Sequence, residues 1–190
     1  MIPFTGLREA EAMGLTWDCV DFEAGTLKIS KQLVKRPNAA GGFTLAETKN
    51  SKIRVIKAAP MVMEQLRMRQ IQQREQRLAA GERWLGFDTI EEQKNALVFT
   101  TATGTNLSPQ TVYNHCKKVL ERIGAGDRCV HDLRHTFAVL SLQNGDDVKT
   151  VQGNLGHATA AFTLDIYGHI SERMKEDSAA RMEKYMQSMA

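Results

Sequence analysis

The stretch His131-Asp132-Leu133-Arg134-His135 combines two imidazoles with a guanidinium. Residues three and four positions apart share one face of a helix, so we expect His131, Arg134 and His135 to project together. Such a face is either a polar surface with a hydrogen-bonded histidine or a source of cations and proton donors. A zinc site is disfavoured, because Asp132 stands where the metalloprotease motif has glutamate and the pattern offers no distant third ligand.

A second group of polar residues follows in the C-terminal half of the chain. Leu155-Gly156-His157 ends a predicted helix, and Tyr167 comes ten residues later. A single tyrosine on an apolar helix face is usually a core residue whose hydroxyl is hydrogen-bonded nearby. Together with His131 and Arg134, however, this group supplies cations, hydrogen-bond donors and one nucleophile. The combination favours a catalytic site.

The order of these motifs resembles that of a known family. The stretch from Val130 to Ile170 is similar to the C-terminal signature of the tyrosine recombinase (phage integrase) family, and Thr5-Gly6-Leu7-Arg8, with Glu11 three residues on, resembles its first arginine box. The resemblance covers nearly the whole chain. A gap between His157 and Tyr167 that is one residue longer, and an extended hairpin near Gly41-Gly42, resemble the conjugative-transposon integrases more than the chromosome-dimer resolvases.

The resemblance implies a pocket that binds the phosphate to be cleaved. Arg8 and Arg134 would bind its non-bridging oxygens, because a planar guanidinium orients a phosphoryl group and neutralises the charge that grows during attack. His157 would donate a further hydrogen bond. Glu11 most resembles a carboxylate that orients this cluster from behind.

The resemblance also implies the covalent step. Tyr167 would attack phosphorus, leaving a 3′-phosphotyrosine and a free 5′-hydroxyl, and His131 would help the tyrosine proton leave. The general acid of the family is a lysine on a β-hairpin. Lys49 fits it best, Lys52 in the same turn is the alternative, and both are otherwise ordinary solvated turn lysines. No cofactor and no metal is implied, because side chains supply the charge that Mg²⁺ supplies elsewhere.

The elements that must position these residues predict an α+β fold that is mostly α. Residues 5–14 are typical of a short helix that stops at Gly14. Alternating apolar residues predict strands at 26–30, 43–45 and 53–56, which form one small antiparallel sheet near the N-terminus with turns at 38–42 and 49–52. Further helices are predicted at residues 61–78, 108–124, 130–143, 147–155, 159–167 and 171–189, and a short strand at 96–99. The resemblance implies the helical catalytic domain of tyrosine recombinases.

The composition is that of an ordinary globular domain. The chain has 190 residues, 42% of them hydrophobic and 25% charged, and its formal net charge of +3 supports a nucleic-acid partner only weakly. No stretch is long and apolar enough for a membrane span, and the first residues lack the regions of a signal peptide. Three cysteines without metal-like or disulfide-like spacing favour a reducing compartment, so the cytoplasm is the expected location.

The resemblance implies partners as well. They are double-stranded DNA, further copies of the chain in a homo-oligomer (a tetramer) on that DNA, and accessory DNA-bending proteins; no membrane is involved. Family members usually carry N-terminal DNA-binding domains, so we expect residues 1–190 to be one catalytic domain truncated at its N-terminus. The amphipathic stretch 171–189, with Met174, Met182 and Met186, is either a helix packed on its own domain or, as the resemblance implies, a tail that docks on a neighbouring subunit.

Two other functions remain alternatives at this point. A type IB topoisomerase uses similar chemistry but needs no partner subunits, and its surrounding domains should wrap a duplex. A catalytically silent DNA-binding module would be favoured by a substitution in the pocket, yet all six predicted catalytic positions carry a suitable residue. Relaxation of supercoils without recombination would identify the first, and DNA binding without a covalent adduct the second.

Overall fold

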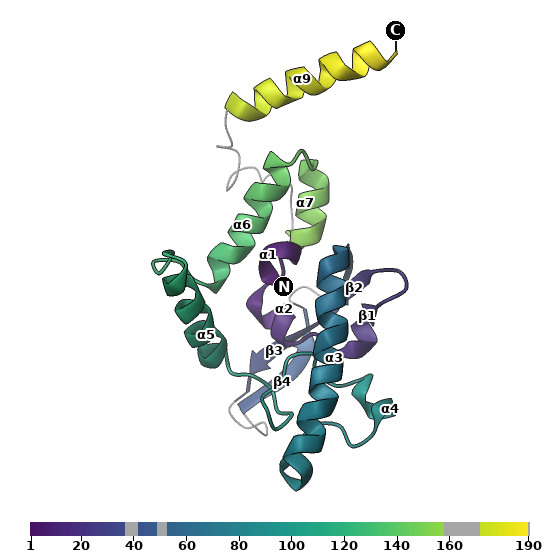
Figure 1. The fold of residues 1–190 in the computed structure, drawn as a ribbon, viewed down its shortest axis with the longest axis vertical. Coiled ribbons are helices and arrows are strands. Elements are labelled where there is room, and N and C mark those ends of the chain that lie inside the picture. The colour runs from purple at the N-terminus through teal and green to yellow at the C-terminus, as the bar shows by residue number, and fades with distance from the viewer. Residues whose placement is uncertain (37–41, 49–52, 158–171, 190) are drawn as a thin grey trace.

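The computed structural model describes residues 1–36, 42–48, 53–157 and 172–189 (Figure 1). The helices are α1 (Ile2–Thr5), α2 (Glu9–Met13), α3 (Pro60–Ala80), α4 (Ile90–Gln93), α5 (Pro109–Arg122), α6 (Val130–Gln143), α7 (Val148–Leu155) and α9 (Glu172–Ser188). The strands are β1 (Val20–Asp21), β2 (Thr26–Ile29), β3 (Lys31–Lys35), β4 (Phe43–Glu47) and β5 (Arg54–Lys57). The prediction of a mostly helical fold with a small antiparallel β-structure is confirmed.

The first segment differs from the single helix predicted at residues 5–14. It forms two short helices, α1 and α2, separated at Gly6, which adopts the left-handed conformation with φ 64°. A Cβ atom at Gly6 would lie 2.5 Å from Phe137 of α6 and 2.8 Å from Leu155 of α7. The residue is therefore a glycine for two reasons, the positive φ and the close approach of two later helices. The break turns α2 away from α1 and leaves Arg8 at the N-terminus of α2.

The predicted single sheet is in fact two. β1, β2 and β5 form one antiparallel sheet in which Leu27 pairs with Ile56, whereas β3 and β4 form a separate hairpin in which Leu33 pairs with Leu45. The prediction missed β3, because lysines stand at both of its ends and Leu33 is its one buried side chain. Only Ser30 separates β2 from β3, so the chain changes sheets within one residue.

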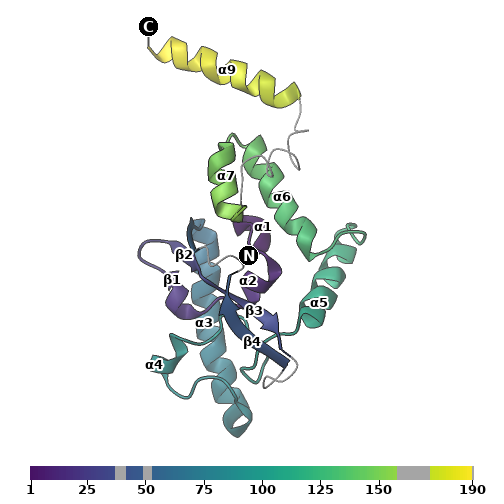
Figure 2. The same ribbon diagram turned by 180° about the vertical axis from the view of Figure 1, so that it is seen from behind.

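The main hydrophobic core lies between the three-stranded sheet and α3 (Figures 1 and 2). It contains Leu27, Ile56, Leu66 and Val98, all nearly or fully buried. The strand predicted at residues 96–99 is not formed; Leu97 makes only an isolated bridge to Thr16. Leu7, immediately before Arg8, belongs to this core and is fully buried. The first arginine box is thus anchored by an apolar side chain on a rigid support.

A second, smaller core joins α6 to α7. Ala138, Leu142, Val151 and Leu155 are buried there, with Phe137 packed against them. The helices themselves match the prediction closely, since α6 spans 130–143 and α7 begins after the N-cap Asp147, whose carboxylate accepts the Thr150 N–H at 2.9 Å. Figures 1 and 2 show both helices beside α1.

The C-terminal part is described only from residue 172 on. The helix predicted at 159–167, with Tyr167, lies outside the described residues, whereas the helix predicted at 171–189 corresponds to α9. In Figures 1 and 2, α9 extends beyond α6 and α7, away from the rest of the chain. None of the helices in the described part is long and apolar enough to span a membrane.

Candidate active site

Arg8 and Glu11 form a local pair at the start of α2. The Glu11 carboxylate accepts the backbone N–H of Arg8 at 2.9 Å through Oε2 and the side-chain Nη1 of Arg8 at 3.0 Å through Oε1. This is the return half of a capping box, which satisfies an N–H that the helix cannot use. Glu11 is 2% exposed, whereas the Arg8 side chain is 44% exposed. The carboxylate therefore holds both the backbone and the guanidinium of an arginine whose side chain is nearly half exposed.

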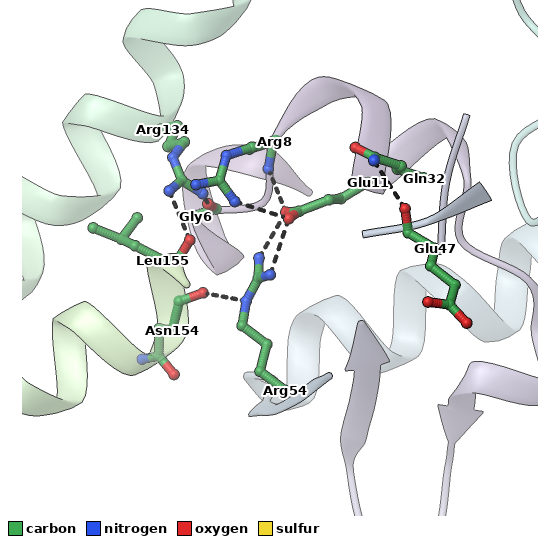
Figure 3. A network of polar contacts seen from close by, with 9 residues as sticks. All are labelled: Gly6, Arg8, Glu11, Gln32, Glu47, Arg54, Arg134, Asn154 and Leu155. Carbon is green, nitrogen blue, oxygen red and sulfur yellow. Dashed lines mark hydrogen bonds and ion pairs between the residues drawn. The ribbon is translucent and has the colours of Figure 1, made fainter. Parts of the chain in front are cut away.

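Arg54, the first residue of β5, binds the same carboxylate. Its Nη1 and Nη2 donate to Oε1 at 2.9 Å and to Oε2 at 2.6 Å, a two-pronged ion pair, and its Nε donates to the Asn154 carbonyl at 2.9 Å (Figure 3). Sequence reasoning did not single out Arg54. Burial would raise the pKa of Glu11, but the hydrogen bonds and charges of Arg54, and then of Arg8, outweigh it and lower this pKa. Glu11 is therefore an ionised carboxylate between two guanidinium groups.

Arg134 projects from α6 toward α1 and the end of α7. Its Nη1 donates to the Gly6 carbonyl and its Nη2 to the Leu155 carbonyl at 2.7 Å, and the side chain is 3% exposed (Figure 3). Carbonyl acceptors fix the plane of a guanidinium without cancelling its charge. The positive charge of Arg134 is thus rigidly placed beside the first arginine box.

His157 follows the last turn of α7. Gly156 ends the helix in the left-handed conformation, φ 64°, and the His157 N–H returns to the Gln152 carbonyl at 3.2 Å. Burial, followed by the charges of Arg134 and Arg8, lowers the pKa of His157 to about 4. A neutral imidazole in a positive environment can donate one hydrogen bond to an anion.

His131 lies at the first turn of α6 with its ring 4.6 Å from that of His135, edge to face. Burial, followed by the charges of His135 and Arg134, lowers the pKa of His131. Asp132 caps the helix by accepting the Cys129 N–H at 2.7 Å. His131 is exposed, so it borders the site instead of being enclosed in it.

The structure thus brings together Arg8, Glu11, Arg134 and His157, with His131 close enough to Arg134 and Arg8 that both charges lower its pKa. Lys49, its alternative Lys52, and Tyr167 lie outside the described residues. Among the described residues, no cluster of histidine, cysteine or acidic side chains could hold a metal ion. Arg8 and Arg54 share the one carboxylate of Glu11, and Arg134 binds only carbonyl groups in the contacts shown in Figure 3, so the cluster keeps an excess of positive charge that suits a phosphate group.

The sequence profile of the Phage integrase family matches residues 3–174. The chain belongs to this family. It is similar to a "Tyrosine recombinase XerC-like" protein of Caldanaerobacter subterraneus subsp. tengcongensis, with 31% identity over 182 residues that cover 92% of this chain and 45% of that protein. It is also similar to the tyrosine recombinase XerD of Corynebacterium glutamicum, with 30% identity over 168 residues that cover 88% and 45%. The chain spans about half the length of these curated relatives.

Solved structures of integrases and recombinases share the fold of this phage integrase family member. The Tn1549 transposon integrase in complex with circular intermediate DNA superposes with a TM-score of 0.70 at 21% identity, covering 95% of this chain and 57% of that one. The XerH site-specific recombinase bound to palindromic difH substrate gives a TM-score of 0.61 at 26% identity, covering 96% and 44%. The predicted tyrosine recombinase catalytic fold is confirmed.

Proposed function

We propose that this chain is the catalytic domain of a site-specific recombinase that cuts and rejoins double-stranded DNA through a tyrosine. One observation carries the proposal: Arg8 at the N-terminus of α2, Arg134 on α6 and His157 just after α7 meet around a single positively charged site. Membership of the phage integrase family supports it. The likeness to the Tn1549 transposon integrase favours the integrase of a mobile element as the finer assignment.

The proposed reaction exchanges one phosphodiester for another. The Tyr167 oxygen attacks phosphorus while His131 helps its proton leave, and the bond to the 5′-oxygen breaks to give a 3′-phosphotyrosine and a free 5′-hydroxyl. Arg8 and Arg134 stabilise the charge that grows on the non-bridging oxygens. Attack by a 5′-hydroxyl of another strand reverses the step and rejoins the DNA. The family pattern supports the roles of Tyr167 as the nucleophile and of His131 in removing its proton.

Lys49 is proposed as the acid that protonates the leaving 5′-oxygen, with Lys52 as the alternative. Replacing that oxygen with sulfur makes protonation unnecessary, because a thiolate leaves readily. Lys49→Ala should therefore be slow on normal DNA and rescued on the 5′-phosphorothiolate duplex, while Lys52→Ala should show neither defect nor rescue. The reverse result would assign the acid to Lys52.

Further copies of the protein complete the proposed assembly. We propose a homo-oligomer, a tetramer, on DNA, assisted by accessory DNA-bending proteins and working in the cytoplasm. Residues 1–190 would form one catalytic domain of this assembly. DNA in the complexes of the Tn1549 integrase and XerH supports the choice of partner.

The test is the covalent adduct. The protein expressed from its natural gene is mixed with a pool of nicked duplexes whose core sequence is randomised, and protein–DNA adducts that survive SDS are isolated and sequenced. Each nick lets the short 5′ fragment diffuse away, so the adduct accumulates. Tyr167→Phe lacks only the hydroxyl and should bind the selected duplex but form no adduct. An adduct that persists in Tyr167→Phe would refute the assignment.

The same material separates the alternatives. Recombination between two copies of the selected site is expected of the proposed function. A topoisomerase would relax a supercoiled plasmid without exchanging strands between sites. A silent module would bind the duplex and leave no adduct at all.

A further inference from the structure

Arg54 links three parts of the site that are far apart in sequence. It lies 43 positions from Glu11 and 100 positions from Asn154, yet it bonds to both. We propose that Arg54 is a positioning residue: by binding Glu11 and the end of α7 together, it sets the orientation of Arg8 relative to His157. This role rests on the proposed function, because it concerns the same pocket.

The Glu11 carboxylate shows how the linkage works. A carboxylate has about four acceptor positions, two on each oxygen. In this site Oε1 accepts Nη1 of Arg8 and Nη1 of Arg54, and Oε2 accepts the Arg8 backbone N–H and Nη2 of Arg54. All four positions are filled, and Arg54 fills two of them. The Glu11 side chain therefore has one orientation, which it passes to the backbone and side chain of Arg8.

The charge of Arg54 matters as much as its shape. Without Arg54, the buried Glu11 would be left with Arg8 as its ion-pair partner among the described residues, and the two charges would neutralise each other. With Arg54 present, a second cation balances the negative charge of the Glu11 carboxylate. The charge of Arg8, whose side chain is 44% exposed, is then left in excess for an anion in front of it.

The other end of the linkage is the C-terminal turn of α7. The Nε of Arg54 donates to the Asn154 carbonyl, one of the carbonyls that a helix end leaves without a partner. The guanidinium also covers Gly156, where an added Cβ would lie 2.9 Å from Nη1. Because Gly156 has no side chain, it leaves room for the Arg54 guanidinium. The next residue in the chain is His157. Because Arg54 is also the first residue of β5, the same side chain ties this strand to the pocket.

The first test keeps the charge and removes the two-pronged geometry. Arg54→Lys should slow adduct formation by about 100-fold at saturating DNA, because a small displacement of Arg8 costs a rate of that order. Arg69→Lys is the matched control. Arg69 is also half-buried and ties α3 to the Val98 carbonyl at 3.1 Å and the Thr100 hydroxyl at 3.1 Å, but it lies outside the site. Arg69→Lys should cleave at about the wild-type rate once both variants are corrected for the folded fraction.

The second test uses the pH dependence of the cleavage rate, corrected for the folded fraction at each pH. In Arg54→Met the main influence that lowers the pKa of Glu11 is gone, and burial raises that pKa. Protonated Glu11 no longer orients Arg8, so the acid limb of the cleavage rate should move to higher pH. In Arg54→Met/Glu11→Gln there is no carboxyl to titrate, and the shift should disappear.

Each outcome decides the point. Arg54→Lys that cleaves at the wild-type rate, a loss confined to DNA affinity, or an acid limb unchanged in Arg54→Met would each overturn the positioning role. These results require a wild-type protein that forms the adduct, so they leave the proposed function intact. A wild-type protein that forms no adduct with any duplex contradicts the proposed function first, and the role of Arg54 with it.

Discussion

Arg8 and Arg134 are both arginines of the proposed phosphate pocket, but their surroundings differ. The Arg8 side chain is 44% exposed and pairs with Glu11, whereas Arg134 is 3% exposed and donates to the carbonyls of Gly6 and Leu155. Replacement by lysine keeps the charge but loses the planar fork. The two residues should therefore respond alike in catalysis and differently in stability.

We expect Arg8→Lys and Arg134→Lys each to lower the single-turnover rate of adduct formation by about 100-fold or more. Arg134→Lys should also lower the free energy of unfolding by about 1–3 kcal/mol, because a buried carbonyl loses its partner. Arg8→Lys should unfold in urea close to the wild type. If both variants cut at the wild-type rate, these arginines are not part of the pocket.

The His157 side chain gives a pH prediction. Its pKa in the folded protein is about 4, below the ordinary value of 6.5, so the folded state disfavours the proton. Above about pH 6.5 neither state holds the proton and stability is unaffected; as the pH falls toward 4, the unfolded chain takes it up first and the free energy of unfolding falls. His157→Gln should lose less stability over this window, although the lowered pKa of His131 leaves part of the loss in place.

The measurement is urea unfolding at a series of pH values, together with titration of the histidine resonances by NMR. Inorganic phosphate should raise the pKa of His157, because an anion in the pocket offsets the charges of Arg134 and Arg8. An unchanged titration in saturating phosphate would argue against an anion site at His157.

At the scale of elements, Gly6 decides how α1 meets α6 and α7. Gly6→Ala adds a Cβ at 2.5 Å from Phe137 as well as strain at φ 64°. Gly124→Ala is the control, since Gly124 has φ 75° and, among the described residues, no atom within 4 Å of an added Cβ. Gly6→Ala should cost about 1–3 kcal/mol more than Gly124→Ala in urea unfolding, the cost of overpacking a core.

Gly6→Ala should also slow cleavage, because the Gly6 carbonyl is an acceptor for Arg134 and shifts with the helix. Equal losses of stability in Gly6→Ala and Gly124→Ala would show that α6 and α7 can move apart to admit the methyl group. The first arginine box would then be less tightly coupled to the second than the contacts indicate.

At the scale of the whole molecule, α9 presents an apolar face that the described residues of the chain leave exposed. Met182, Tyr185 and Met186 are each 60% or more exposed, which does not support the interpretation of this helix as packed on its own domain. Deleting residues 171–190 should therefore weaken assembly of the multi-subunit DNA complex more than it weakens binding of one protomer. Gel-shift titration resolves the two species, and unchanged assembly would favour a helix that serves its own domain.

The sequence by itself determined the parts of this protein whose causes are local. Ser108 and Asp147 cap α5 and α7 by accepting N–H groups three residues away, so both helices start where the sequence predicts. The helix α6 and the order of the arginine and tyrosine boxes were equally readable, and with them the fold class and the family. The expectation that Glu11 orients the arginine cluster came from the resemblance, and the contact between Glu11 and Arg8 is local, because a capping pair spans only three positions.

Only the tertiary structure decided the features that depend on distant partners. The chain breaks its helix at Gly6 where Phe137 and Leu155 approach closely, and the residues near Gly6 in sequence do not predict this approach. The role of Arg54 could not be predicted for the same reason: its partners lie on α2 and α7. Lys49 and Tyr167 remain predictions. Hydrogen bonds between neighbours leave a signature in the spacing of residues, whereas an ion pair across 43 positions forms only when packing has brought its charges together.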